Sequence, residues 1–206
     1  MHRSLALLAL LAHSLGGCFV FPLLIATGGA QRERSTPIGE PAAVHGAIAL
    51  GLAASDATWA PADELPYLAL DADGQLGEGP LWLTSFYGIG YSDDVPTASP
   101  RGQGSTTTFD FGIGVRHYRA LGPIEPFVGI GGAFVDRSFT YTDPEPGNLY
   151  DYSVGIYLEA GVQCAVAENF ALGLLARRYL GDDQSIAAHD FEADYSTFAV
   201  MLTFRR

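Results

Sequence analysis

Alternating apolar and polar positions between Tyr152 and Tyr179 form the clearest structural pattern in the chain. Two alternating runs flank a short polar turn at Glu168 and Asn169. One face of the two runs is apolar and consists of Val154, Ile156, Leu158, Ala160, Val162, Phe170, Leu172, Leu174 and Ala176. The opposite face mixes small, aromatic and charged side chains. Because the repeat has a period of two, it predicts a β-hairpin rather than a helix.

The same alternation predicts further strands on both sides of this hairpin. The expected strands are 44–52, 65–72, 81–91, 106–118, 127–139, 152–164, 170–179 and 195–204. The connections after the first, third, fifth and seventh strands are expected to be long, and most of the others are expected to be short. Long loops at one end and short turns at the other are typical of a transmembrane β-barrel.

Strand length supports the same interpretation. A tilted membrane strand needs ~9–11 residues, whereas strands of soluble sheets are usually nearer to ~5–6 residues. Most of the expected strands reach the longer value. The predicted fold class is therefore all-β: residues 44–206 form an eight-stranded antiparallel up-and-down transmembrane β-barrel, which follows an N-terminal signal peptide.

Composition narrows the possible functions. Charged residues make up only 17% of the 206 residues and apolar residues 48%, which is low in charge for a soluble domain. The formal net charge of −12 argues against nucleic acid as a partner, because phosphate groups are bound by basic surfaces. After the leader, no run of 18 apolar residues predicts a spanning helix, so a membrane crossing requires a closed barrel.

Residues 1–30 show a secretory signal pattern, with a basic start followed by an apolar stretch. Two cleavage positions are compatible with this pattern. Residues 15–18 (Leu-Gly-Gly-Cys) resemble a bacterial lipoprotein box, which makes Cys18 a candidate lipid anchor. The small residues that end at Ala30 instead predict ordinary cleavage. Residues 31–43 are mostly polar and contain two prolines, so we expect a linker there.

Three segments resemble a known family. The expected last strand resembles the insertion signal of bacterial outer-membrane barrels, and its alternating residues are Phe198, Val200, Leu202 and Phe204. Residues 125–134 and 157–179 resemble strands of the small outer-membrane β-barrel superfamily that includes OmpA-type and OmpX-type barrels. The resemblance covers residues 44–204 and departs from the family pattern at Arg205 and Arg206. It implies a bacterial outer-membrane location, with outer-membrane lipid and the barrel-assembly machinery as partners.

If the apolar faces meet lipid, the narrow lumen of an eight-stranded barrel receives four charged side chains, namely Asp110, Arg116, Glu159 and Arg177. Buried charges are costly unless they are paired. Glu159 and Arg177 lie on adjacent expected strands, so we predict that they form a stabilising ion pair. A proton or ion path is the alternative. Glycines on the lumen face are expected to leave room for larger neighbours.

No catalytic motif stands out, and no cofactor or metal is expected. We therefore expect a monomer with a structural, adhesive or surface-interaction role through long acidic outer loops. Three alternatives remain open: cation binding by loop acids, catalysis by an outer-membrane lipid-modifying enzyme, and ligand binding by an exported soluble barrel with an apolar interior. The cation-binding alternative would use Asp182, Asp183, Asp190 and Glu192, and the enzyme alternative would use Ser185, His189 and Asp190.

Overall fold

The computed structural model describes residues 44–55, 64–93, 104–141, 147–182, 184–186, 189–191 and 193–206. The predictions for the signal peptide, the linker and the lipid anchor at Cys18 lie outside these residues.

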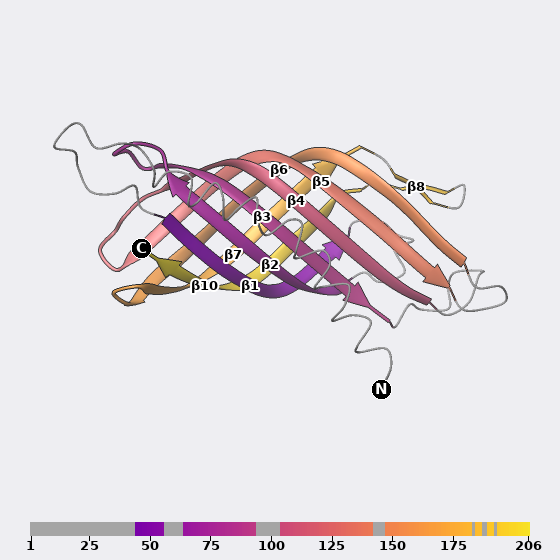
Figure 1. Cartoon of the computed structure of the whole chain (residues 1–206), viewed down its shortest axis with the longest axis horizontal. Helices are drawn as coiled ribbons and strands as arrows, with labels where there is room; N and C mark the ends of the chain where they lie inside the picture. Colours follow the sequence, from indigo (N-terminus) through magenta and orange to yellow (C-terminus); the bar gives the residue numbers. More distant parts are fainter. Residues whose placement is uncertain are drawn as a thin grey trace, which may run out of the picture. The chain divides into compact units, whose positions relative to one another are not determined.

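Eight strands close into an antiparallel barrel (Figure 1). They are β1 (Val44–Ser55), β2 (Glu64–Gln75), β3 (Leu81–Ser92), β4 (Gly104–Tyr118), β5 (Ile124–Tyr141), β6 (Gly147–Ala167), β7 (Phe170–Gly181) and β10 (Tyr195–Arg205). Successive strands pair around the barrel, and β10 pairs with β1 to close it. Two short strands, β8 (Gln184–Ile186) and β9 (His189–Phe191), form a separate hairpin between β7 and β10. The predicted eight-stranded all-β barrel is confirmed.

β5 and β6 are longer than the sequence pattern predicts. β5 runs from Ile124 to Tyr141, and β6 begins at Gly147, so the predicted loop at 142–149 is partly strand. Each residue from Phe139 to Tyr141 has a ladder partner on β6. Backbone pairing between Phe139–Tyr141 and Gly147–Leu149 extends both strands toward this connection.

β2 is also longer than predicted. The sequence predicts a turn from Asp73 onward, but Asp73 and Gly74 pair with β3, and β2 continues to Gln75. The turn lies at 76–80 instead, and Gly77 has a φ of 72° there. Only glycine adopts this backbone conformation readily. This extension matters for the interior, because it places Asp73 on a strand that faces the lumen.

Burial alternates along each barrel strand and shows which face points outward. Large apolar side chains are exposed on the outer face, including Leu50, Val128, Ile130, Val154, Ile156, Leu172, Leu174, Phe198 and Val200. An exposed apolar surface of this extent is unfavourable in water and favourable in lipid. The alternative of a soluble barrel with an apolar interior and a charged exterior is therefore wrong: the charged face points inward.

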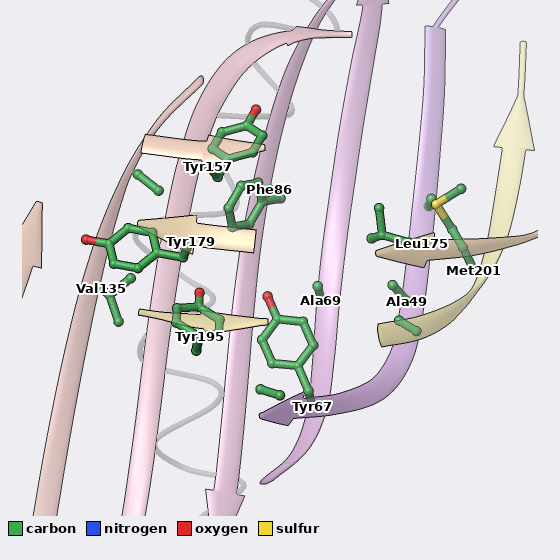
Figure 2. Close-up of a cluster of buried hydrophobic side chains, with 14 of the residues drawn as sticks. Ala49, Tyr67, Ala69, Phe86, Val135, Tyr157, Leu175, Tyr179, Tyr195 and Met201 are labelled. Atoms are coloured by element: carbon green, nitrogen blue, oxygen red, sulfur yellow. The ribbon is translucent and has the colours of Figure 1, made fainter. Parts of the chain in front are cut away.

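Buried side chains from most of the barrel strands point into the interior. Figure 2 shows the rings of Tyr67, Phe86, Tyr157, Tyr179 and Tyr195 gathered inside the barrel, together with the small side chains of Ala49 and Ala69. The five rings are each at most 3% exposed. Large and small residues therefore complement one another, as expected for an interior packed to high density.

The described residues contain no helix that is long and apolar enough to cross a membrane.

Candidate functional site in the barrel interior

Five buried charged side chains meet inside the barrel, and we refer to them as the charged cluster. Asp71 and Asp73 come from β2, Arg116 from β4, Glu159 from β6 and Arg177 from β7. Each is at most 5% exposed. Their strands place them together because each occupies an inward position of the two-residue repeat.

Arg116 is the centre of the charged cluster. Its Nε and Nη2 donate to the two carboxylate oxygens of Glu159 at 2.8 and 2.9 Å, a bidentate arrangement. Its Nη1 donates to Asp73 Oδ2 at 2.8 Å, and its Nη2 also donates to Asp71 Oδ2 at 3.0 Å. Hydrogen bonds between charged groups are among the strongest in proteins. One guanidinium group therefore joins strands on opposite sides of the lumen.

Arg177 shares two of these acids with Arg116. Its Nη2 lies 3.0 Å from Glu159 Oε2 and 3.1 Å from Asp71 Oδ2. Glu159 and Arg177 are also direct ladder partners on β6 and β7. The ion pair expected from the sequence is thus present in the structure, as part of a larger group that includes Asp71 and Asp73.

Asp110 lies apart from the charged cluster. Among the described residues, its hydrogen-bond partners are two tyrosines: Tyr67 donates to both carboxylate oxygens at 2.9 Å, and Tyr195 donates to Oδ2. Asp110 stands six positions before Arg116 on β4, or ~20 Å along an extended strand. The sequence places both side chains in the lumen but does not show at what depth each one finds partners.

Both arginines also lie over aromatic rings. The guanidinium carbon of Arg177 lies 3.5 Å from the centre of the Phe86 ring, and that of Arg116 lies 4.7 Å from the centre of the Phe127 ring. Such cation–π contacts offset part of the cost of removing a cation from water. The rings thereby complete the environment of the two buried cations.

Three buried aromatic side chains lie in the barrel interior toward the short turns. His45 stacks on Trp82 with ring centres 4.1 Å apart, and the Tyr118 ring lies 5.4 Å from Trp82. Tyr118 also donates to Asp73 Oδ2 at 2.5 Å, which joins these rings to the charged cluster. All three rings are at most 8% exposed.

Two lumen glycines make room for these contacts. A Cβ atom at Gly129 would lie 2.4 Å from Glu159 Oε1, and a Cβ atom at Gly88 would lie 1.9 Å from Asp110 Oδ1. Both distances are far below van der Waals contact. At Gly129 this agrees with the space that lumen glycines were expected to leave for large neighbours, and Gly88 is a further position of the same kind.

The groups of the charged cluster are in contact with one another. The charged cluster contains three carboxylates and two guanidinium groups, all engaged with one another. No group of three or more His, Cys, Asp or Glu residues in the described part of the chain has an arrangement that suits a metal ion. Cys164, the described cysteine, lies exposed on the outer face of β6.

The loop residues of the alternative functions are described only in part. Ser185 and Asp190 are ladder partners in the β8–β9 hairpin, as are Ile186 and His189. The side chains of residues 183–192 lie outside the described residues, so the catalytic and cation-binding alternatives stay predictions.

The residues of the expected insertion signal lie on the outer face of β10. Phe198, Val200 and Phe204 are exposed, and Leu202 is half-buried. The strand pairs with β7 on one side and with β1 on the other.

Comparisons with known proteins show which solved structures share this fold. No family model and no curated protein matches the chain. A major outer-membrane protein of Thermus thermophilus matches with a TM-score of 0.61 and 14% identity, over 81% of this chain and 100% of that one. This chain has the fold of a small bacterial outer-membrane β-barrel. Neisserial surface protein A matches this barrel with a TM-score of 0.56 and 15% identity, over 80% of this chain and 95% of its own.

The attachment invasion locus protein Ail of Yersinia pestis, solved with the heparin analogue sucrose octasulfate, has the same fold. Its TM-score is 0.55 at 8% identity, over 80% of this chain and 99% of Ail. The apolar outer face of the barrel strands agrees with this fold, because an outer-membrane barrel presents such a face to lipid.

Proposed function

We propose that this chain is a non-conducting barrel of the bacterial outer membrane that presents its long connections for structural or adhesive contacts at the cell surface. The observation that carries this proposal is the combination of a filled lumen with an anchored connection between β7 and β10. A filled lumen leaves the outer surface as the part of the molecule that can meet a partner.

Two groups of buried side chains support a closed lumen. The charged cluster joins β2, β4, β6 and β7 across the lumen. The rings of His45, Trp82 and Tyr118 lie toward the short turns. Eight-stranded barrels have an interior just wide enough for side chains. This packing supports a barrel that conducts neither ions nor solutes.

The connection at 182–194 is fixed to the barrel at both ends. The Ser153 hydroxyl donates to the Asp182 carbonyl at 2.7 Å. Asp194 accepts from the Gly181 amide at 3.1 Å and from Arg178 Nη2 at 3.2 Å. These bonds hold the base of the β8–β9 hairpin in a defined position, which lowers the entropy lost when a partner binds it.

Charge indicates the chemistry of the partner. The connections 56–63, 93–103, 142–146 and 182–194 contain one arginine, Arg101, and many acids. The acids are Asp56, Asp63, Asp93, Asp94, Asp143, Glu145, Asp182, Asp183, Asp190, Glu192 and Asp194. The negative electrostatic field of these acids repels polyanions. Although Ail was solved with a polysulfated ligand, we propose a neutral or cationic partner for this chain.

We propose a non-catalytic role because the sequence shows no nucleophile motif and the charges of the charged cluster are engaged with one another. The fold also serves proteins whose names describe attachment or a surface location, which supports a surface role without specifying its partner.

The test uses the full-length protein in neutral phosphatidylcholine nanodiscs, with immobilised polylysine and immobilised heparin as probes. We expect salt-sensitive binding to polylysine and none to heparin. Replacing residues 183–192 by a short Gly-Ser turn should weaken polylysine binding, whereas Glu168→Gln at the opposite end should not. Binding to heparin, or unchanged binding after the replacement, would contradict the proposal.

A further inference from the structure

Arg205 is the residue at which the chain departs from the outer-membrane strand pattern, and its side chain faces the interior of the barrel. Inward and outward positions alternate along β10, and Met201 and Thr203 before it are both buried inward residues. Arg205 continues that face, and its side chain is only 17% exposed. The departure from the family pattern therefore adds a lumen residue rather than a lipid-facing one.

Arg205 forms a bidentate ion pair with Glu125 of β5. Arg205 Nη2 lies 2.6 Å from Glu125 Oε2, and Nη1 lies 3.2 Å from Oε1. Gln163 of β6, which is fully buried, donates to the same carboxylate at 3.2 Å. Glu125 is thus held from two sides, with its own side chain 23% exposed.

This ion pair crosses the mouth of the barrel. β5 and β10 are not neighbours in the sheet, because β6 and β7 lie between them. The backbone ladders therefore link these two strands only indirectly, through β6 and β7. The Arg205–Glu125 ion pair and its bond from Gln163 connect them directly at the short-turn end.

The same end of β10 forms the seam at which the barrel closes. Val44 and Arg206 exchange two backbone hydrogen bonds, each of 3.1 Å, and His45 is the ladder partner of Arg205. Among the described strands of the barrel, β1 and β10 are the one adjacent pair that is not consecutive in chain order. Closing this pair therefore costs the most chain entropy.

We propose that the Arg205–Glu125 ion pair is a latch that holds the β1–β10 seam closed at the short-turn end. By fixing Arg205 from across the lumen, Glu125 keeps the end of β10 aligned with the start of β1. A bidentate geometry and a second donor from Gln163 distinguish this pair from an ordinary flexible surface ion pair, which contributes little.

The experiment measures amide hydrogen exchange of the folded full-length protein in detergent micelles by NMR. In Arg205→Ala we expect exchange of the slowest amides in 44–48 and 202–206 to accelerate about fivefold, as loss of a partly exposed charged pair implies. Amides of the β3–β4 pair, at 83–87 and 111–115, should keep their rates. Arg206→Ala is the matched control, since its backbone forms the seam bonds and its exposed side chain is outside the latch.

The charge reversal Glu125→Arg with Arg205→Glu should restore slow exchange at the seam, because it rebuilds the pair with opposite polarity. If Arg205→Ala does not refold, Glu125→Gln provides the same comparison and leaves β10 unchanged. Unchanged seam exchange, or equal acceleration at the seam and in the β3–β4 pair, would overturn the latch.

Discussion

At the scale of single residues, the interior is governed by the cost of burying charge. Removing an ionised group from water is unfavourable unless close partners and hydrogen bonds replace the lost hydration. Arg116 meets this requirement with three carboxylates and a tyrosine hydroxyl. Because each member depends on the others, the loss of any one leaves an uncompensated charge inside the barrel.

A double-mutant cycle of Glu159→Gln and Arg177→Gln tests this dependence. We expect each single change to lower the free energy of unfolding by about 3–5 kcal/mol, because it leaves its partner unpaired. The double variant should lose less than the sum, with a coupling of about 1–3 kcal/mol. Urea unfolding in lipid vesicles measures the free energy of unfolding of the unaltered protein, the two single variants and the double variant.

The control for this cycle is Arg119→Ala in an exposed turn, which should change the free energy of unfolding by less than about 0.5 kcal/mol. Strictly additive losses for Glu159→Gln and Arg177→Gln would contradict the role of the two residues as stability partners.

Gly129→Ala tests the space that the charged cluster requires. The new Cβ would lie 2.4 Å from Glu159 Oε1, so Glu159 must move away from Arg116. We expect a loss of about 1–3 kcal/mol in the free energy of unfolding, as for overpacking elsewhere. Gly132→Ala on the same strand meets its nearest atom at 3.9 Å and should be nearly neutral. Equal losses for the two changes would show that the loss in the free energy of unfolding comes from backbone propensity and not from lack of space beside Glu159.

The sequence predicts part of this cluster. Alternation alone assigns Arg116, Glu159 and Arg177 to the lumen face, because an inward position needs only the two-residue period. Asp73 is missed because Asp73-Gly74 signals a turn locally, whereas pairing with β3 extends the strand through it. Asp71 lies within the expected strand 65–72 but is not counted among the expected lumen charges. Their alternation with Leu68 and Leu70 was a usable signal. Which residues share a depth depends on strand tilt and register, which one sequence does not contain.

At the scale of elements, each barrel strand separates lipid from lumen by its two-residue repeat. Apolar runs such as those of β7 and β10 were therefore assigned to the correct face from the sequence. Strand ends were less predictable. The extension of β5 and β6 and the β8–β9 hairpin depend on backbone pairing with distant partners, and this pairing leaves only a weak local signal.

Leu174→Arg tests the lipid-facing side of β7. Leu174 is 59% exposed near the middle of the strand, where an arginine in a bilayer costs about 2–4 kcal/mol. Val166→Arg, which lies beside the short turn and is 57% exposed, should cost at most about 1 kcal/mol. Urea unfolding in vesicles measures the free energy of unfolding of both variants. Equal costs at the two positions would mean that the outer face of β7 is not in contact with lipid.

At the scale of the whole molecule, the closed barrel and its buried interior side chains support the proposed surface role. Every barrel strand has two neighbours, so the sheet presents no open edge to the bilayer. The charged cluster and the aromatic rings occupy the interior. The barrel is therefore expected to act through its surface.

Reconstitution into planar lipid bilayers tests the filled lumen. We expect no channel openings from the folded protein even in concentrated salt, because the lumen is too narrow to conduct once side chains fill it. Arg116→Ala together with Arg177→Ala removes the two largest cluster side chains and is the matched comparison. Steady conductance of the unaltered protein would contradict the filled lumen.

The most direct test of the membrane barrel is the electrophoretic mobility of the membrane-extracted protein in SDS, with and without boiling. A closed membrane barrel pairs all of its strands and resists SDS until it is heated. We expect two bands of different mobility, the unboiled one compact and the boiled one unfolded. A single band of unchanged mobility, from protein recovered in the soluble fraction, would contradict the membrane barrel and every proposal that depends on it.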